Sequence, residues 1–127
     1  MRVRHRPSVP SDFAALGETP GYRCQCITAL AGDDIVGLGG FVWRDGAVWA
    51  SVIITEQARA YPAGIHRVGL AAMRFARELG LTRVYAMPQP DNPAAERWLR
   101  RLGFAETDMA GEPVFVWTAG TRDAAMD

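Results

Sequence analysis

The chain has 127 residues, of which 49% are hydrophobic and 22% are charged, a composition typical of a soluble globular protein. Its 14 basic residues, all of them arginine, balance 14 acidic residues, and a net charge of zero argues against a nucleic-acid partner held by bulk phosphate attraction. The length fits one domain over residues 1–127 and leaves no room for a second.

No hydrophobic run approaches the ~20 residues of a membrane span. The basic start, Met1–Arg6, leads into Pro7 rather than into the hydrophobic core of a signal peptide, so we expect a cytoplasmic protein without a membrane partner. Cys24 and Cys26 are expected to be small buried thiols, because a metal site would need two more ligands. No metal is predicted.

The first 23 residues are rich in proline and glycine, and they predict an irregular segment with one short helix, Ser11–Leu16, capped by Ser11. Alternating hydrophobic residues then predict three strands, at 24–31, 35–43 and 47–55. Asp45-Gly46, between the second and third strands, is a strong signal for a two-residue hairpin turn. The three strands should therefore form an antiparallel meander.

The hydrophobic period then changes to that of a helix. From Gly64 to Leu79, hydrophobic residues fall three and four positions apart, and Gly80 is placed to end the helix. Asn92 followed by Pro93 predicts the start of a second helix. The elements expected after the first helix are a strand at 83–87, a helix at 93–102, strands at 104–109 and 114–118, and a loose tail at 119–127.

A strand, a helix and another strand in succession imply a right-handed crossover and therefore one parallel pair in a mixed sheet. The pattern alone predicts an α/β or α+β fold. Residues 81–104 also resemble the closing half of a GNAT-type N-acetyltransferase domain. That resemblance rests on Asn92, Ala95, Trp98 with Leu99, and the ending Leu102-Gly103-Phe104.

The helix from Gly64 matches the main CoA-binding helix of that family, and the resemblance covers residues 24–118. It implies a mixed, mostly antiparallel central sheet with a splayed parallel pair and flanking helices. It also implies acetyl-CoA as co-substrate and an amine as acceptor. The family usually opens with a strand and two helices, so the chain resembles an N-terminally shortened member. Its acceptor specificity would come from a protein partner, from a second copy, or from nothing at all.

The resemblance implies that pantetheine inserts between the splayed strands, and that a helix N-terminus holds the pyrophosphate. The loop departs from the family pattern, because Tyr61 replaces a Gln or Arg, Pro62 removes an N–H donor and His66 replaces a small residue. A protonated His66 could contact the anion with Arg59 and Arg67; otherwise it fills an abandoned cradle. The residues that the resemblance assigns to the cofactor are Ile54, Gly64, Ile65, His66, Arg67 and Asn92.

Acetyl transfer to an amine needs a base, and an acid to protonate the departing thiolate. Leu99 stands where many members of the family carry a tyrosine as the acid. Glu56, at the end of the third strand, and Glu18 are the candidate bases by region, and Tyr85 is the candidate acid. The alternatives are a solvated carboxylate for Glu56 and simple packing for Tyr85.

Three functions remain open from the sequence. The first is an N-acetyltransferase, weak or inactive if the altered positions are disabling. The second is a non-catalytic module of the same fold, such as a phage or mobile-element assembly protein that becomes part of a virion. Phe41, Trp43 and Trp49 could belong to its interface, although on alternating strands some of them must be core. The third is a regulator that responds to CoA or a nucleotide.

Overall fold

The computed structural model describes residues 2–19, 21–89 and 92–120, which form a seven-stranded sheet with three α-helices and a short 3-10 helix. In chain order the elements are β1 (Val3–Pro7), α1 (Pro10–Ala15), β2 (Arg23–Ala31), β3 (Asp34–Arg44), β4 (Ala47–Ile54), η1 (Glu56–Ala60), α2 (Pro62–Glu78), β5 (Arg83–Ala86), α3 (Pro93–Arg101), β6 (Ala105–Met109) and β7 (Glu112–Thr118).

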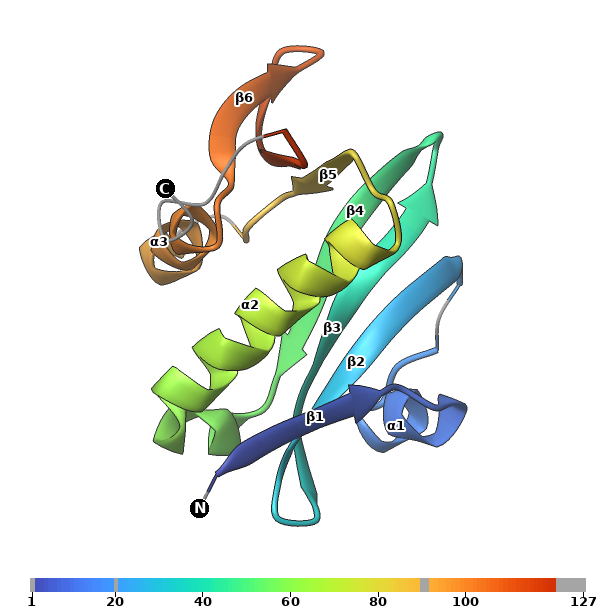
Figure 1. Cartoon of the computed structure of the whole chain (residues 1–127), viewed down its shortest axis with the longest axis vertical. Coiled ribbons are helices and arrows are strands. Elements are labelled where there is room, and N and C mark those ends of the chain that lie inside the picture. Colours follow the sequence, from blue (N-terminus) through green and yellow to red (C-terminus); the bar gives the residue numbers. More distant parts are fainter. Residues whose placement is uncertain (1, 20, 90–91, 121–127) are drawn as a thin grey trace.

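The strands lie in the order β1-β2-β3-β4-β5-β7-β6 (Figure 1). Only β4 and β5 run parallel among these neighbours; the others are antiparallel. The predicted mixed, mostly antiparallel sheet with one parallel pair and flanking helices is therefore confirmed. The meander turn is confirmed as well, since Asp45 and Gly46 both have positive φ angles, 52° and 75°, as a two-residue hairpin turn requires.

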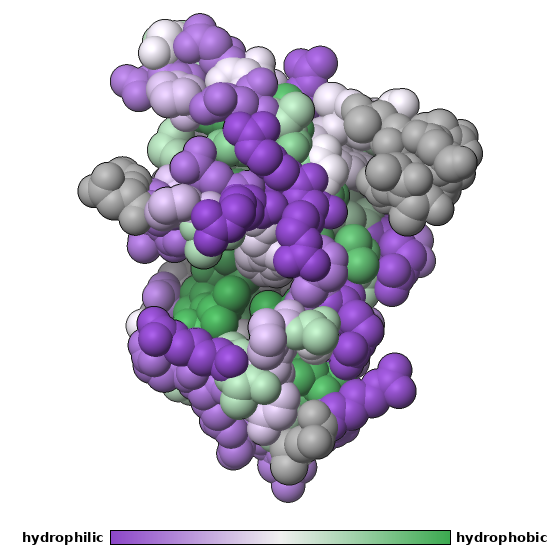
Figure 2. Space-filling model, turned by 90° about the vertical axis from the view of Figure 1, so that its left-hand side faces the viewer, coloured by the Kyte–Doolittle hydropathy of each residue, from purple (hydrophilic) through white to green (hydrophobic). Residues whose placement is uncertain are grey.

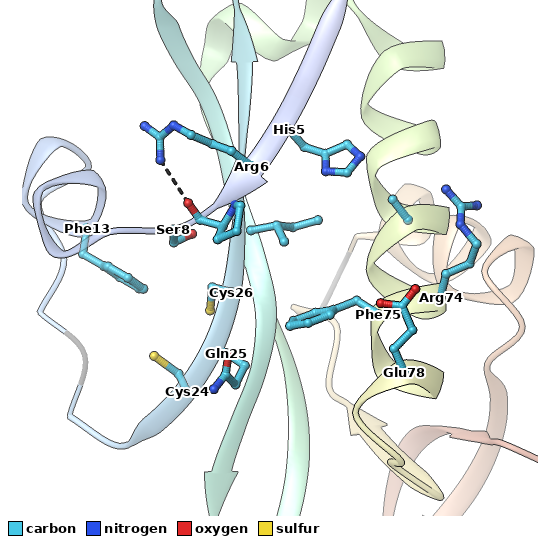
Figure 3. A pocket seen from close by; sticks show the side chains of 13 residues that line it. His5, Arg6, Ser8, Phe13, Cys24, Gln25, Cys26, Arg74, Phe75 and Glu78 are labelled. Carbon is cyan, nitrogen blue, oxygen red and sulfur yellow. Dashed lines mark hydrogen bonds between the residues drawn. The ribbon is translucent and has the colours of Figure 1, made fainter.

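The two faces of the sheet carry different helices, and Figure 3 draws α1 and α2 on opposite sides of β2. Paired residues share a face, and the face alternates along each strand. Thr28, whose hydroxyl donates a hydrogen bond to Asp12 of α1, lies opposite Leu38 on the neighbouring strand, and Leu38 lies opposite Ile53. We call the side of these three residues the α1 face and the opposite side the α2 face.

The main hydrophobic core lies on the α2 face. Phe41, Val84, Phe115 and Trp117 are each at most 2% exposed, and residues of α2 and α3 pack over them. Phe41 is therefore a core residue, one of the aromatics that the alternation of the strands requires to be buried. Trp43 packs half-buried against the same core.

The N-terminal region differs from the expected irregular segment. Residues Val3–Pro7 form β1, an edge strand paired antiparallel with β2 from Val3 opposite Ala31 to Pro7 opposite Ile27. The helix begins at Pro10 with Val9 as its N-cap, so Ser11 lies inside the helix rather than capping it. The strand was not predicted because Val3 stands between arginines, so the segment carries no clear hydrophobic pattern. The burial of Val3 depends on its contact with Gly64 of α2, which is distant in the sequence.

Asp12 joins α1 to the sheet. Its carboxylate accepts two hydrogen bonds from Arg6, at 2.7 and 2.9 Å, and one each from the Val9 N–H and the Thr28 hydroxyl. The Arg6 guanidinium and these two donors hold the pKa of Asp12 well below its usual range, although burial of the carboxyl opposes the shift. Asp12 therefore stays ionised while only 2% exposed.

Replacing Asp12 with asparagine is expected to lower the free energy of unfolding at pH 7 by about 2 kcal/mol, since it removes charge-assisted hydrogen bonds. A carboxyl with a depressed pKa stabilises the fold above its unfolded pKa, near 3.9, and this contribution disappears as the pH falls through the folded value. The difference between wild type and Asp12→Asn should therefore narrow below about pH 4. Urea unfolding at several pH values measures it, and Asp33→Asn, in an exposed 3.9 Å ion pair, is the control. A difference that stays constant with pH would contradict this role.

The predicted loose tail lies mostly outside the described residues, which end at Gly120. Ala119 itself is held to the sheet, because its N–H donates to the carbonyl of Thr82 at 3.0 Å. In the part of the chain that the structure describes, no helix is long and apolar enough to cross a membrane.

Candidate functional site

The parallel strands β4 and β5 part soon after they meet. They pair at Trp49 opposite Tyr85, and β5 ends one residue later at Ala86, whereas β4 continues to Ile54. The second half of β4 therefore has β3 on one side and no described strand on the other. Its hydrophobic side chains are exposed accordingly, Val52 to 53% and Ile54 to 45%.

A cavity of about 920 Å³ occupies the space where the strands part. It is lined by Ser51–Ile54 of β4, by Ile65 and Val68 of α2, and by Met87–Gln89 after β5, with Asn92 and Trp98 on the far side. Seen from this side, the molecule is hollowed in its lower half, and the hollow has a hydrophobic floor (Figure 2). A largely hydrophobic cavity beside a free strand edge is suited to an extended ligand that carries amide groups.

The N-terminus of α2 lies near one end of this opening. The helix begins at Pro62, and its first turn contains Gly64. A Cβ at Gly64 would lie 2.7 Å from Val3 Cγ2, so the glycine is required by packing against β1. Arg67 folds back toward the same turn, with a guanidinium nitrogen 3.6 Å from that Cβ position. Free N–H groups and a guanidinium thus converge at this helix end.

His66 is committed to a contact between helices. The indole N–H of Trp98, on α3, donates to Nδ1 of His66 at 3.1 Å. Burial, and to a lesser extent the charge of Arg101, lower the pKa of His66, which favours the neutral ring that this bond requires. His66 therefore joins α2 to α3, a contact between helices far apart in the sequence that the sequence did not reveal.

The prediction that Asn92 is the N-cap of the second helix is confirmed. Its side-chain oxygen accepts a hydrogen bond from the N–H of Ala95 at 3.1 Å and caps α3. Of the residues predicted to bind the cofactor, Ile54, Ile65 and Asn92 line the cavity. Gly64, His66 and Arg67 do not line it; they belong to the first turns of α2.

The two predicted catalytic residues are not brought together. Tyr85 lies at the narrow end, where β4 and β5 meet, beside Ala86, which lines the cavity. Glu56 lies in η1, beyond the far end of β4, where its exposed carboxylate pairs with Arg59 at 3.3 Å. Glu18 follows α1 and does line the cavity, as do Leu38 and Ser51 of the α1 face. Among the described residues, Glu18 is the one carboxylate that lines the cavity.

A second cavity, of about 440 Å³, lies at the edge of β2 where β1 ends (Figure 3). Cys24 and Cys26 line it as free, half-buried thiols. Burial and the neighbouring Cys24 raise the pKa of Cys26 to about 12, which makes Cys26 a poor nucleophile at neutral pH. No group of three or more potential metal ligands occurs in the described ranges.

The sequence matches no protein-family model and no curated protein. The structure, however, is similar to solved acetyltransferases. It resembles yncA from Salmonella typhimurium, a putative acetyltransferase solved with acetyl-CoA, with a TM-score of 0.74 and 16% identity over 98% of each chain.

The GNAT domain of PAT from S. lividans gives a TM-score of 0.70 with 13% identity over 91% of this chain and 90% of that domain. An acetyltransferase from Bacillus subtilis in complex with CoA gives 0.64 with 16% identity, over 91% and 95% of the two chains. The chain therefore has the fold of the GNAT acetyltransferases, as the segment 81–104 predicted.

Proposed function

We propose that this protein binds acetyl-CoA where β4 and β5 part and transfers the acetyl group to an amine. The observation that carries the proposal is the open edge of β4 after Trp49, with a cavity of about 920 Å³ beside it. Strands that stayed paired would leave no space for a ligand. Here the space is present and largely hydrophobic.

The contacts of the cofactor follow from the free groups at the site. Pantetheine, an extended chain with two amides, can add to the edge of β4 as an extra strand. The pyrophosphate then falls at the N-terminus of α2, where Arg67 lies and the helix dipole favours an anion. Pro62 contributes no N–H, so Arg67 carries more of that contact than in a glycine-rich loop. The similar proteins solved with CoA or acetyl-CoA support this assignment.

In the transfer itself, the amine nitrogen attacks the thioester carbonyl carbon, and the C–S bond breaks as the amide forms. Glu18, directly or through a water molecule, accepts the proton that the amine loses. Tyr85 is the group nearest the meeting point of the strands that can protonate the CoA thiolate. Its hydroxyl oxygen accepts a hydrogen bond from Arg83 Nη1 at 3.5 Å, which leaves the hydroxyl hydrogen available to donate.

A non-catalytic binding module is the second candidate, and one observation favours it. Leu99 lines the cavity where the family resemblance places the acidic tyrosine, and Glu18 alone supplies a carboxylate to the lining among the described residues. Such a protein would bind the cofactor and release no thiol.

Acetyl-CoA at a hundred times its dissociation constant is expected to stabilise the protein by about 2.7 kcal/mol, seen as a rise in melting temperature. Arg67→Gln should reduce this rise, because Arg67 lies at the proposed pyrophosphate site. Arg74→Gln, an exposed arginine on the same helix that lines the second cavity instead, is the control and should leave it unchanged. Absence of any rise in the wild type would overturn the proposal. Thiol release with an amine present then separates the enzyme from the binding module.

A further inference from the structure

Two arginines and two aromatic rings form a group at the meeting point of β4 and β5. The rings of Trp49 and Tyr85 lie 5.6 Å apart between centroids. The guanidinium carbon of Arg44 lies 5.0 Å from the centroid of Trp49, and Arg83 donates to the hydroxyl of Tyr85. We call these four residues the arginine–aromatic patch.

The patch lies on the α1 face. Trp49 is two residues from Ser51, which pairs with Gly40 and thus lies on the same side as Leu38. Arg44 follows Val42, the partner of Trp49, by two residues, and Arg83 precedes Tyr85 by two. Residues two apart on a strand share a face, so all four side chains project to one side.

This part of the α1 face is accessible. Helix α1 has six residues and packs at the other end of the face, where Asp12 contacts Thr28. Over the patch, the Arg44 side chain is 43% exposed, and Arg83 is exposed as well. The cavity reaches the same face through Ser51 and Ile53. A molecule lying on the patch is therefore beside the point where the acetyl group would be delivered.

The patch has excess positive charge. Among the described residues, Asp45 is the one carboxylate within 4.0 Å of either guanidinium. It lies at the hairpin turn, 3.7 Å from Arg44, and is 88% exposed. One guanidinium therefore remains without a charge partner. Guanidinium groups bind carboxylates and phosphonates through paired hydrogen bonds, while a second cation brought to the same place is repelled.

From this geometry we infer that the acceptor is an amine that also carries an oxyanion, held by Arg44 and Arg83 while Trp49 and Tyr85 contact its hydrophobic part. This inference rests on the proposed acetyl transfer and names its substrate class. Arg44 stacks on Trp49 and Arg83 contacts Tyr85, the two residues that pair where the strands part, so an oxyanion bound by these arginines lies on the same part of the sheet as the reacting amine. Amino acids and aminophosphonates fit this description, and polyamines are disfavoured.

The test compares acceptors that differ in charge. Phenylalanine, its aminophosphonate analogue, phenylalaninamide and spermidine are offered to the full chain with saturating acetyl-CoA, and kcat/KM is obtained from thiol release. We expect the two anionic acceptors to exceed phenylalaninamide by roughly tenfold or more, and spermidine to be the poorest. Their ratio to each other tells carboxylate from phosphonate.

Variants test whether Arg44 and Arg83 cause the preference for anionic acceptors. Arg44→Gln should lower kcat/KM for the anionic acceptors by roughly tenfold and leave phenylalaninamide unchanged. Arg83→Gln also removes the hydrogen bond to the Tyr85 hydroxyl, so its expected effect is a roughly tenfold fall in the ratio of kcat/KM for phenylalanine to that for phenylalaninamide. Arg23→Gln is the matched control, because Arg23 also stacks on a tryptophan, 4.7 Å from the centroid of Trp43, but on the α2 face. Equal use of phenylalanine and phenylalaninamide by the wild type, or variants that leave their ratio unchanged, would overturn the inference.

Calorimetry of acceptor binding separates failure of this inference from failure of the proposed function. If acetyl-CoA raises the melting temperature and phenylalanine binds no better than phenylalaninamide, the substrate class is wrong and the cofactor assignment stands. If acetyl-CoA has no effect, the function is wrong. The patch is then judged by phenylalanine binding alone, which Arg44→Gln and Arg83→Gln should each weaken by roughly tenfold, with Arg23→Gln unchanged. In that case too, equal binding of phenylalanine and phenylalaninamide would overturn the inference.

Discussion

Replacing Gly40 with alanine is expected to destabilise the fold by about 3 kcal/mol, a large part of the stability of a domain of this size. Gly40 lies in the middle of β3, and a Cβ there would overlap the carbonyl oxygen of Gln25 and lie 2.6 Å from Cys26 Cα. Both are backbone atoms of β2, so the strands themselves would have to move apart. Urea unfolding measures the change in the free energy of unfolding.

Gly21→Ala is the control for this experiment. Gly21 has open space around its Cβ position and a φ outside the left-handed region. Its replacement should change stability by less than ~1 kcal/mol and in the stabilising direction, because alanine has less freedom in the unfolded chain. Equal urea midpoints for the two variants would show that β2 and β3 adapt at Gly40 and that their close approach is not required.

Replacing Glu18 with glutamine is expected to lower kcat by roughly 100-fold, the contribution typical of a positioned general base. The amide keeps the shape of the side chain and cannot accept a proton. Glu18 is exposed, so the fold and the binding of acetyl-CoA should be unaffected. Thiol release under saturating acetyl-CoA and amine gives kcat.

Glu56→Gln is the matched variant, since it makes the same chemical change at the other carboxylate that the sequence proposed. Glu56 is 84% exposed, pairs with Arg59 and does not line the cavity, so its activity should stay within about twofold of the wild type. The reverse result, loss in Glu56→Gln and none in Glu18→Gln, would falsify the assignment of the base.

The elements that the sequence predicted are those determined by local signals. The hairpin at Asp45-Gly46 needs two positive φ angles, and α2 follows a long 3.6-residue period. The cap at Asn92 depends on a side chain and an N–H three residues apart. Each signal is contained within a few neighbouring residues, so no knowledge of the rest of the chain was needed.

The features that the sequence missed depend on residues far apart in the chain. Val3 makes β1 a strand because it packs on Gly64, and Trp98 gives His66 a role because α3 packs against α2. The arginine–aromatic patch likewise gathers Arg44 and Arg83 from strands that the sequence separates by a whole crossover. The sequence placed Tyr85 and Ile54 in the strands where the structure has them, whereas the position of Glu18 at the cavity required the tertiary structure.

Because β4 and β5 pair at Trp49 and Tyr85 and then part, the cofactor would, under the proposed function, take the place of a strand between them. Its binding would connect β4 to the segment that contains β5 and α3, and it would lower the fraction of unfolded chain available to proteases. Acetyl-CoA levels in the cell would then set how long each molecule survives. The abundance of this protein should rise and fall with the supply of its own substrate.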